Sequence, residues 1–321
     1  MEEIEKFEFL AEKEDEKKRI DLFLSKKCSF SRSFVSRLIS HGNVDVNGEK
    51  IKPSFRIRKD DIIRCLVPDP EPLSIEPENI DIDILYEDEF LAAVNKPPGM
   101  VVHPCPGHYN KTLVNAALYH FKNMAQSDSV RPGIIHRLDK DTSGVILIAK
   151  TGSSLEKMSL LFKERKVQKK YIAVVYGSPP ETGEIEKPVG RHINDRKKMS
   201  VNSLNGRYSF TSWRVITYFD GISVLEVEIK TGRTHQIRVH MASEGFPIVG
   251  DIIYGFKKPL KHLKNRKLAA FINKNTFRQM LHSKSMEFKH PETGEKIFVE
   301  APFFSDMENF INGLKEMQSG I

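Results

Sequence analysis

Apolar residues recur at helical spacing near the start of the chain. Ile20, Phe23 and Leu24 lie three and four positions apart, which predicts a short helix. A second helix follows, and either Ser29 or Ser31 can cap its first turn. The inner face of this second helix consists of Phe34, Val35, Leu38 and Ile39.

The segment after the second helix predicts a β-hairpin. Gly42 can end the helix because glycine adopts a positive φ without penalty. Residues 44–46 and the pair Lys50-Ile51 are the two arms, and Asn47-Gly48 between them supplies the two positive φ values of a type I′ turn. Basic side chains of the second helix and of the following strands can form one basic face, which comprises Arg32, Arg37, Lys50, Lys52, Arg56, Arg58 and Lys59.

A proline-rich break separates this unit from the rest of the chain. Pro68, Pro70 and Pro72 cannot continue a helix or an inner strand. The expected organisation is an acidic tail over residues 1–17, a small domain over 18–67, a linker over 68–80, a large domain over 81–304 and a C-terminal tail over 305–321.

Short strands dominate the pattern of the large domain. They are expected at residues 91–94, 145–149, 171–176, 210–218, 224–229 and 297–300. Helical patterns are fewer and cover residues 112–121, 154–164 and 234–243. Strand runs with irregularly placed helices predict an α+β fold with a mixed, mostly antiparallel sheet flanked by helices.

Composition narrows the class of protein. No window approaches the roughly eighteen apolar residues of a membrane span, and the acidic N-terminus is unlike a basic targeting peptide, so we expect a cytoplasmic protein. The 3 cysteines are scattered and indicate a reduced compartment. The formal net charge of +7, with much of the acid in the first residues, leaves a basic remainder that favours polyanions such as nucleic acid.

A polar loop between two apolar runs is the most informative segment. Residues 136–144 read HRLDKDTSG and lie between Ile134-Ile135 and the run 145–148. Turn-forming residues between β-branched runs predict a loop held by two buried strands, where catalytic groups often sit. Asp139 and Asp141 can equally well hydrogen-bond their own turn, so the loop taken alone leaves both interpretations open.

The loop sequence His-Arg-Leu-Asp-x-x-Thr-Ser-Gly resembles the signature loop of the RluA/RluD-type pseudouridine synthases at every fixed position. Five further segments resemble motifs of the same family and occur in its order: residues 95–104, 170–173, 231–240, 250–255 and 281–283. The two short helices, the hairpin and the basic residues of the small domain resemble the S4 RNA-binding module.

The resemblance implies a function and a set of site residues. It assigns the catalytic carboxylate to Asp139, the arginine that pairs with this carboxylate to Arg238, and an active-site tyrosine to Tyr171. Asp141 occupies a variable position of the motif and is interpreted as scaffold. Contacts with the substrate are expected from Arg137, His136, Arg233 and Leu281. Isomerisation of uridine to pseudouridine is redox-neutral, so we expect no cofactor and no metal.

Three alternatives stay open at this point. His103, Cys105 and His108 could belong to a zinc site, although a fourth ligand is not evident. Ser154 and Lys157, with residues 230–232, mimic part of a serine acylase. A protein that only binds RNA during ribosome assembly would show the same basic surface. We favour a monomer that acts on RNA, ribosomal RNA of the large subunit before transfer RNA.

Overall fold

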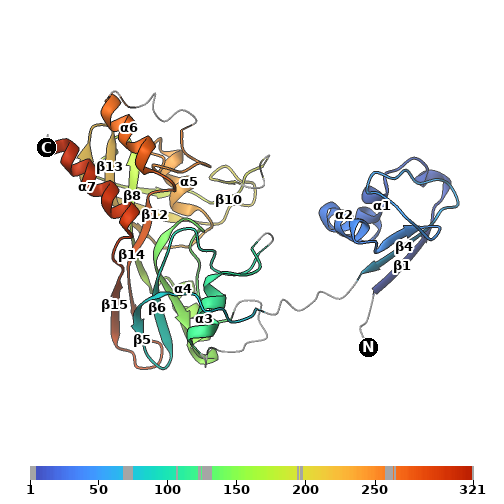
Figure 1. The fold of residues 1–321 in the computed structure, drawn as a ribbon, viewed down its shortest axis with the longest axis horizontal. Coiled ribbons are helices and arrows are strands. Elements are labelled where there is room, and N and C mark those ends of the chain that lie inside the picture. The colour runs from blue at the N-terminus through green and yellow to red at the C-terminus, as the bar shows by residue number, and fades with distance from the viewer. Residues whose placement is uncertain are drawn as a thin grey trace. The chain divides into compact units, whose positions relative to one another are not determined.

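The computed structural model describes residues 5–67, 75–105, 108–121, 124, 132–193, 195, 198–256, 263 and 265–319. Internal contacts divide the chain into a small unit, residues 1–74, and a large unit, residues 75–321. Figure 1 shows both units and labels many of their helices and strands. Residues 68–74 of the expected linker lie outside the described residues.

The small unit combines an antiparallel sheet with two short helices. Its elements are β1 (Glu5–Leu10), the 3-10 helix η1 (Lys13–Asp15), α1 (Ile20–Lys27), α2 (Arg32–Ser40), β2 (Val44–Val46), β3 (Glu49–Lys50) and β4 (Ile62–Val67), with the strand order β1-β4-β2-β3. Ser31 caps α2 by accepting a hydrogen bond from the Phe34 backbone N–H at 3.2 Å. Asn47 and Gly48 have φ values of 54° and 83°, as the hairpin turn requires. The expected helices and hairpin are confirmed.

Strand β1 differs from the expectation of an acidic tail over residues 1–17. Residues 5–10 pair with β4, which brings Phe7 opposite Cys65 and Phe9 opposite Ile63. The Phe9 ring contacts the Phe23 ring edge-on, with the centroids 5.8 Å apart. The alternation of aromatic with charged residues is a strand pattern that the acidic composition of the segment obscured.

The large unit is built on one mixed sheet. Its strands are β5 (Asp83–Glu87), β6 (Leu91–Lys96), β7 (Ser143–Ala149), β8 (Gln168–Tyr176), β9 (Thr182–Glu186), β12 (Phe210–Phe219), β13 (Ile222–Ile229), β14 (Leu281–Lys289) and β15 (Lys296–Glu300). The order is β5-β6-β7-β14-β8-β13-β12-β9, and β15 pairs with β14. Strands β7 and β14 are parallel, whereas the other pairs described for this sheet are antiparallel. The predicted α+β class and mostly antiparallel sheet are confirmed.

Helices and a separate two-stranded sheet accompany this large sheet. They are α3 (Leu113–His120), α4 (Gly152–Lys163), α5 (Gln236–Ser243), α6 (Arg266–Asn275) and α7 (Ser305–Ser319), together with the hairpin of β10 (Gly190–Arg191) and β11 (Met199–Ser200). Helix α7 lies where the sequence predicted a C-terminal tail, and it buries Met307, Phe310 and Leu314. No helix in the described part of the chain is long and apolar enough to cross a membrane.

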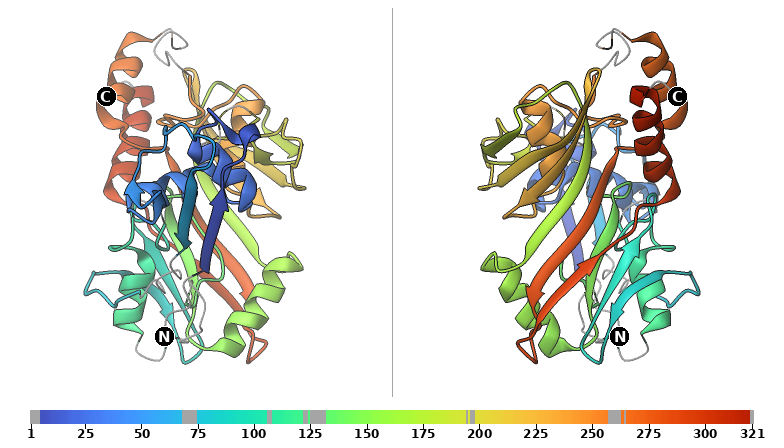
Figure 2. Two further views of the ribbon diagram at one scale, coloured as in Figure 1. Left: turned by 90° about the vertical axis from the view of Figure 1, so that its right-hand side faces the viewer. Right: turned by 90° about the vertical axis from the view of Figure 1, so that its left-hand side faces the viewer.

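Strand β8 contributes to a core on each face of the sheet, because successive side chains point to opposite faces. Ile172, Val174 and Tyr176 belong to a core with α6 and α7, which lie side by side in Figure 2. Tyr171 and Ala173 belong to the other core, which includes apolar residues of α3 and α5. The face that carries Tyr171 therefore also carries α5, and the candidate site forms there.

Gly144 allows the loop 136–144 to join the sheet beside β14. It has a φ of 108°, and a Cβ at this position would lie 2.2 Å from the backbone oxygen of Ser283. The neighbouring Ser143 hydroxyl is hydrogen-bonded to His282 Nδ1 at 2.9 Å. Close contact of the two strands places the loop next to Leu281, the first residue of β14.

We expect Gly144→Ala to lower the free energy of unfolding by about 3 kcal/mol or more, because the added Cβ meets backbone and the positive φ is strained for alanine. Gly152→Ala is the matched control, since its Cβ would meet nothing within 4 Å and the residue begins α4. Urea titration measures both. Equal stability of the two variants would contradict the close approach.

Candidate active site

The loop 136–144 is anchored at its start by His136. The Leu147 backbone N–H donates a hydrogen bond to His136 Nε2 at 2.9 Å, and the imidazole stacks on the Phe162 ring at 4.9 Å. Burial lowers the pKa of His136 to about 3, so the ring is neutral and can accept this bond. His136 thus connects the loop to β7, a contact that the expected substrate-binding role did not include.

Arg238 links two carboxylates that are distant in the sequence. Its Nε and Nη2 donate to Asp251 at 2.6 and 3.0 Å, and its Nη1 donates to Asp139 Oδ2 at 2.9 Å. The Arg238 side chain is 4% exposed, that of Asp251 0% and that of Asp139 16%. Asp139 is therefore the end of this arrangement that reaches solvent.

The charges of this cluster stabilise one another. Burial opposes the charged guanidinium, but hydrogen bonds with Asp251 and the charge of Asp139 outweigh it, so the pKa of Arg238 lies above its ordinary value. Burial acts to raise the pKa of Asp251, yet bonds from Arg238 and from the backbone N–H groups of Ile253 and Tyr254 keep this pKa low. Asp251 is an anchor, because its oxygens already accept these bonds.

A pocket with about 50 Å³ of free space adjoins Asp139. Six of the predicted site residues line it: Arg137, Asp139, Tyr171, Arg233, Arg238 and Leu281. They come from the loop 136–144, β8, α5 with the segment before it, and β14, so sheet pairing and helix packing bring them together. His136 lines a neighbouring cavity instead.

Tyr171 is a neutral phenol in this pocket. Its side chain is buried among the core residues of β8 and β13, and this burial raises the pKa of Tyr171 to about 12. Near neutral pH its hydroxyl is consequently a hydrogen-bond donor and acceptor, and its ring is one wall of the pocket.

His235 and Tyr254 lie in the motif segments 231–240 and 250–255, but the sequence assigned them no role in the site. The Met199 backbone N–H donates to the Tyr254 hydroxyl at 2.7 Å, and this hydroxyl lies 2.8 Å from His235 Nδ1. If the hydroxyl donates to Nδ1, the imidazole proton resides on Nε2, which lies 3.9 Å from Asp139 Oδ1. Burial lowers the pKa of His235, which favours this neutral form.

Lys96 is a third residue whose part in the site was missed. Its side chain is fully buried, and Nζ donates to the backbone oxygens of Pro97, Met100 and Lys140 at 2.8, 2.9 and 3.0 Å. Burial lowers the pKa of Lys96 to about 7, although three acceptors match the three protons of the ammonium form. The residue joins the segment 97–100 to the loop that carries Asp139.

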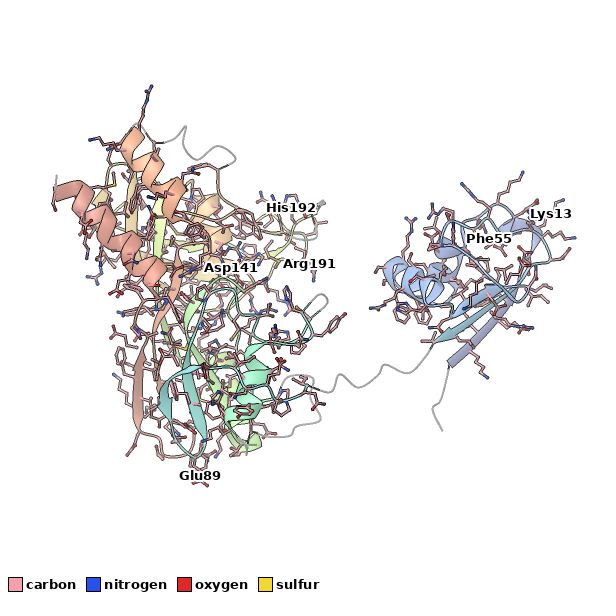
Figure 3. All side chains as sticks on the ribbon, in the orientation of Figure 1. Lys13, Phe55, Glu89, Asp141, Arg191 and His192 are labelled. Carbon is pink, nitrogen blue, oxygen red and sulfur yellow. The ribbon has the colours of Figure 1, made fainter. Side chains whose placement is uncertain are left out.

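Asp141 lies at the end of the loop and is labelled in Figure 3. Its backbone oxygen accepts a hydrogen bond from Arg278 Nη1 at 3.0 Å, and Arg278 also forms a two-point ion pair with Asp306 of α7. This connection of the loop to α7 is made by the backbone, so the interpretation of the Asp141 side chain as scaffold stays a prediction.

The two alternative chemical sites receive no geometric support. Ser154 belongs to the capping box of α4 with Thr151, and its hydroxyl donates to the Phe90 backbone oxygen at 2.8 Å. Among the described residues, no three His, Cys, Asp or Glu side chains lie together in a way that could hold a metal ion.

The basic residues proposed for the small unit are all exposed. Arg32 Nε donates to Asp21 at 2.9 Å, and Arg56 donates to the Lys17 backbone oxygen at 2.8 Å. The guanidinium of Arg37 lies over the Phe34 ring at 5.4 Å. These contacts orient the three arginines at the surface, and the RNA-binding role of the basic residues stays a prediction.

Comparison with known proteins defines the class. The family model for RNA pseudouridylate synthase matches residues 91–243, and the model for the S4 domain matches residues 18–63. The chain belongs to the RNA pseudouridine synthase family, and its two domains imply that it binds RNA.

Relatives match over almost the whole chain. An RNA pseudouridine synthase of Aquifex aeolicus is 43% identical over 92% of this chain and 93% of its own. The ribosomal large subunit pseudouridine synthase D of Zymomonas mobilis is 39% identical over 87% of each chain. The solved structure of human RNA pseudouridylate synthase domain containing 1 covers 77% of this chain and 98% of its own, with a TM-score of 0.55 and 25% identity.

We expect Asp251→Asn to lower the free energy of unfolding by about 3 kcal/mol at neutral pH, because it leaves the buried Arg238 with one carboxylate partner. The folded-state pKa of Asp251 lies below 3.8, so the contribution is fully present above pH 3.8 and is lost as the pH falls below it. Denaturant titrations at several pH values measure this.

Asp306→Asn is the matched control, since Asp306 forms the same two-point pair with Arg278 but its side chain is 29% exposed. We expect a smaller loss of stability for this variant. A loss of stability as large as that of Asp251→Asn would contradict the idea that burial makes the Arg238 cluster more costly to break.

Proposed function

We propose that this enzyme converts uridine to pseudouridine in large-subunit ribosomal RNA, with Asp139 as the catalytic carboxylate. The observation that carries the assignment is the position of Asp139, which lines the pocket while its partner Arg238 is held by the buried Asp251. The ribosomal target is supported by relatives named ribosomal large subunit pseudouridine synthase D that match most of the chain.

The reaction breaks the N1–C1′ bond, turns the uracil and joins C5 to C1′. C5 loses a proton and N1 gains one, so atoms and electrons balance without an oxidant or reductant. A carboxylate can act as nucleophile at C1′ or on the base, or can assist the loss of the C5 proton. The hydrogen bond from Arg238 Nη1 to Asp139 Oδ2, at 2.9 Å, orients the carboxylate for each of these roles.

Tyr171 and Leu281 provide the surroundings of the base. Both are buried and line the pocket, and their strands β8 and β14 are paired. An aromatic ring and an apolar side chain can hold a flipped base between them. The Tyr171 hydroxyl is also available for the proton transfer from C5, either directly or through water.

Arg137 limits the space that is available to the base in the pocket. The free space beside Asp139, about 50 Å³, is well below the size of ordinary ligand pockets. Arg137 is exposed and lines both this pocket and a neighbouring cavity. Its planar guanidinium can move toward the RNA and stack on the bases that the flipped nucleotide leaves behind.

We expect Asp139→Asn to lower turnover by several orders of magnitude and to change RNA affinity little, because the substitution removes the reactive carboxylate and keeps its shape. Release of tritium from RNA that carries [5-³H]uridine measures the reaction, since C5 loses its hydrogen. Asp141→Asn is the control and should retain most of the activity. The reverse ranking would move the catalytic role to Asp141, and no tritium release by the wild-type enzyme from ribosomal RNA would refute the proposed target.

The small unit should contribute to RNA affinity by neutralising phosphates. We expect replacement of Lys50, Lys52, Arg56 and Arg58 by Gln to weaken binding and to reduce the slope of log affinity against log salt by roughly 0.7 for each phosphate that is no longer neutralised. Replacement of the exposed Lys289 and Lys296, which lie on the β14–β15 hairpin, is the control. An unchanged slope of log affinity against log salt in the variant with all four substitutions would exclude these residues from phosphate binding.

A further inference from the structure

A second cavity of about 500 Å³ adjoins the Asp139 pocket. The two share Arg137, Tyr171, Ile229, Gly232 and Arg233 as lining residues. A ligand larger than the small pocket can therefore extend into the larger cavity. The charge of the residues that line the larger cavity determines which part of that ligand can bind there.

Lys169 is the most deeply buried of the polar residues that line this cavity. It precedes Tyr171 by two positions on β8, so both side chains lie on one face of the sheet, about 6 to 7 Å apart. Lys169 is 4% exposed, and its Nζ lies over the Phe162 ring at 5.5 Å. Nowhere in the described part of the chain does a carbonyl or carboxylate oxygen accept a hydrogen bond from this ammonium.

Lys96 shows how the same fold treats a buried ammonium that has a structural role. The two lysines are buried to a similar extent, at 0% and 4% exposure. Lys96 donates to three backbone oxygens, whereas Lys169 has an aromatic ring and the distant charge of Glu228. Burial lowers the pKa of Lys169 to about 8, and the charge of Glu228 offsets only part of this effect.

The charge of the cavity wall indicates the missing partner. Besides Lys169, the cations on the wall are Arg137, Lys163, Arg165, Lys230 and Arg233. None of the described residues that line the cavity is Asp or Glu. His136 is neutral, as its low pKa shows. Such a wall complements an anion, and its free volume is sufficient for a nucleotide.

We propose that Lys169 binds a backbone phosphate of the RNA strand, next to the uridine whose base enters the Asp139 pocket. The proposal rests on the proposed function for the identity of the strand. A phosphate oxygen supplies the acceptor that the ammonium lacks among the described residues. The hydrogen bond between Lys169 and the phosphate holds the RNA strand next to Tyr171. It thereby fixes which nucleotide faces Asp139.

The test uses an RNA stem-loop that the wild-type enzyme converts, as shown by tritium release. A series of such RNAs carries one uncharged methylphosphonate linkage at each position around the target uridine. We expect one linkage beside the uridine to weaken wild-type binding roughly tenfold, since it removes a charge-assisted hydrogen bond. Lys169→Met should bind the unmodified RNA roughly tenfold more weakly and should be insensitive to that linkage.

Lys170→Met is the matched control, because Lys170 is the next residue on β8 and its ammonium pairs with Glu226 Oε1 at 3.3 Å. It should retain the sensitivity of the wild type at the same linkage. Lys169→Arg keeps the charge and should restore part of the affinity. The stability of Lys169→Met should be equal to or higher than that of the wild type, since an unpaired buried charge is replaced by an apolar chain.

Two results would overturn the proposal. One is a methylphosphonate effect in Lys169→Met as large as in the wild type at every linkage. The other is a loss of stability in Lys169→Met and Lys169→Arg alike, which would make the residue part of the fold. Failure of the proposed function is distinguishable, because it would appear as RNA binding by the wild type without tritium release.

Discussion

The site depends on one arginine that is held between two carboxylates. Asp251 takes two of the guanidinium N–H groups and Asp139 takes a third, so the plane of Arg238 determines where the Asp139 carboxylate lies. The cluster carries one positive and two negative charges, and only the Asp139 end is open to the pocket. A lysine could supply the positive charge but could not donate hydrogen bonds to two carboxylates in one plane. The position of the Asp139 carboxylate is therefore set by the buried ion pair of Arg238 with Asp251.

Much of the fold could be predicted because its signals are local. The cap at Ser31, the turn at Asn47-Gly48 and the apolar runs of the large sheet are each contained within a few residues. Strand β1 and helix α7 were missed for a different reason. The N-terminal segment was interpreted from its acidic composition and not from the alternation of Phe7 with Phe9. The segment of α7 was assigned as a tail, although Met307, Phe310 and Leu314 recur at helical spacing.

The residues of the site also fall into those that the sequence could predict and those that it could not. Asp139, Tyr171, Arg238 and Leu281 could be named because they lie in segments that resemble family motifs, and the structure brings them to one pocket. The partners of these residues could not be named, since each partnership joins parts of the chain that no local pattern connects. Asp251 reaches Arg238 through the turn after α5, Tyr254 reaches His235 beside Met199, and Lys96 reaches the backbone of Lys140 across 44 positions.

The small free volume beside Asp139 has a consequence for the choice of target. A nucleotide has to leave its stack before it can enter, and unstacking costs a few kcal/mol, least for a base that is unpaired or mismatched. Discrimination then depends on how easily an RNA segment deforms, in addition to any reading of base edges. Uridines in regular helices are protected by the rigidity of their own duplex. A pocket of this size therefore favours uridines in the loops, bulges and junctions of an RNA.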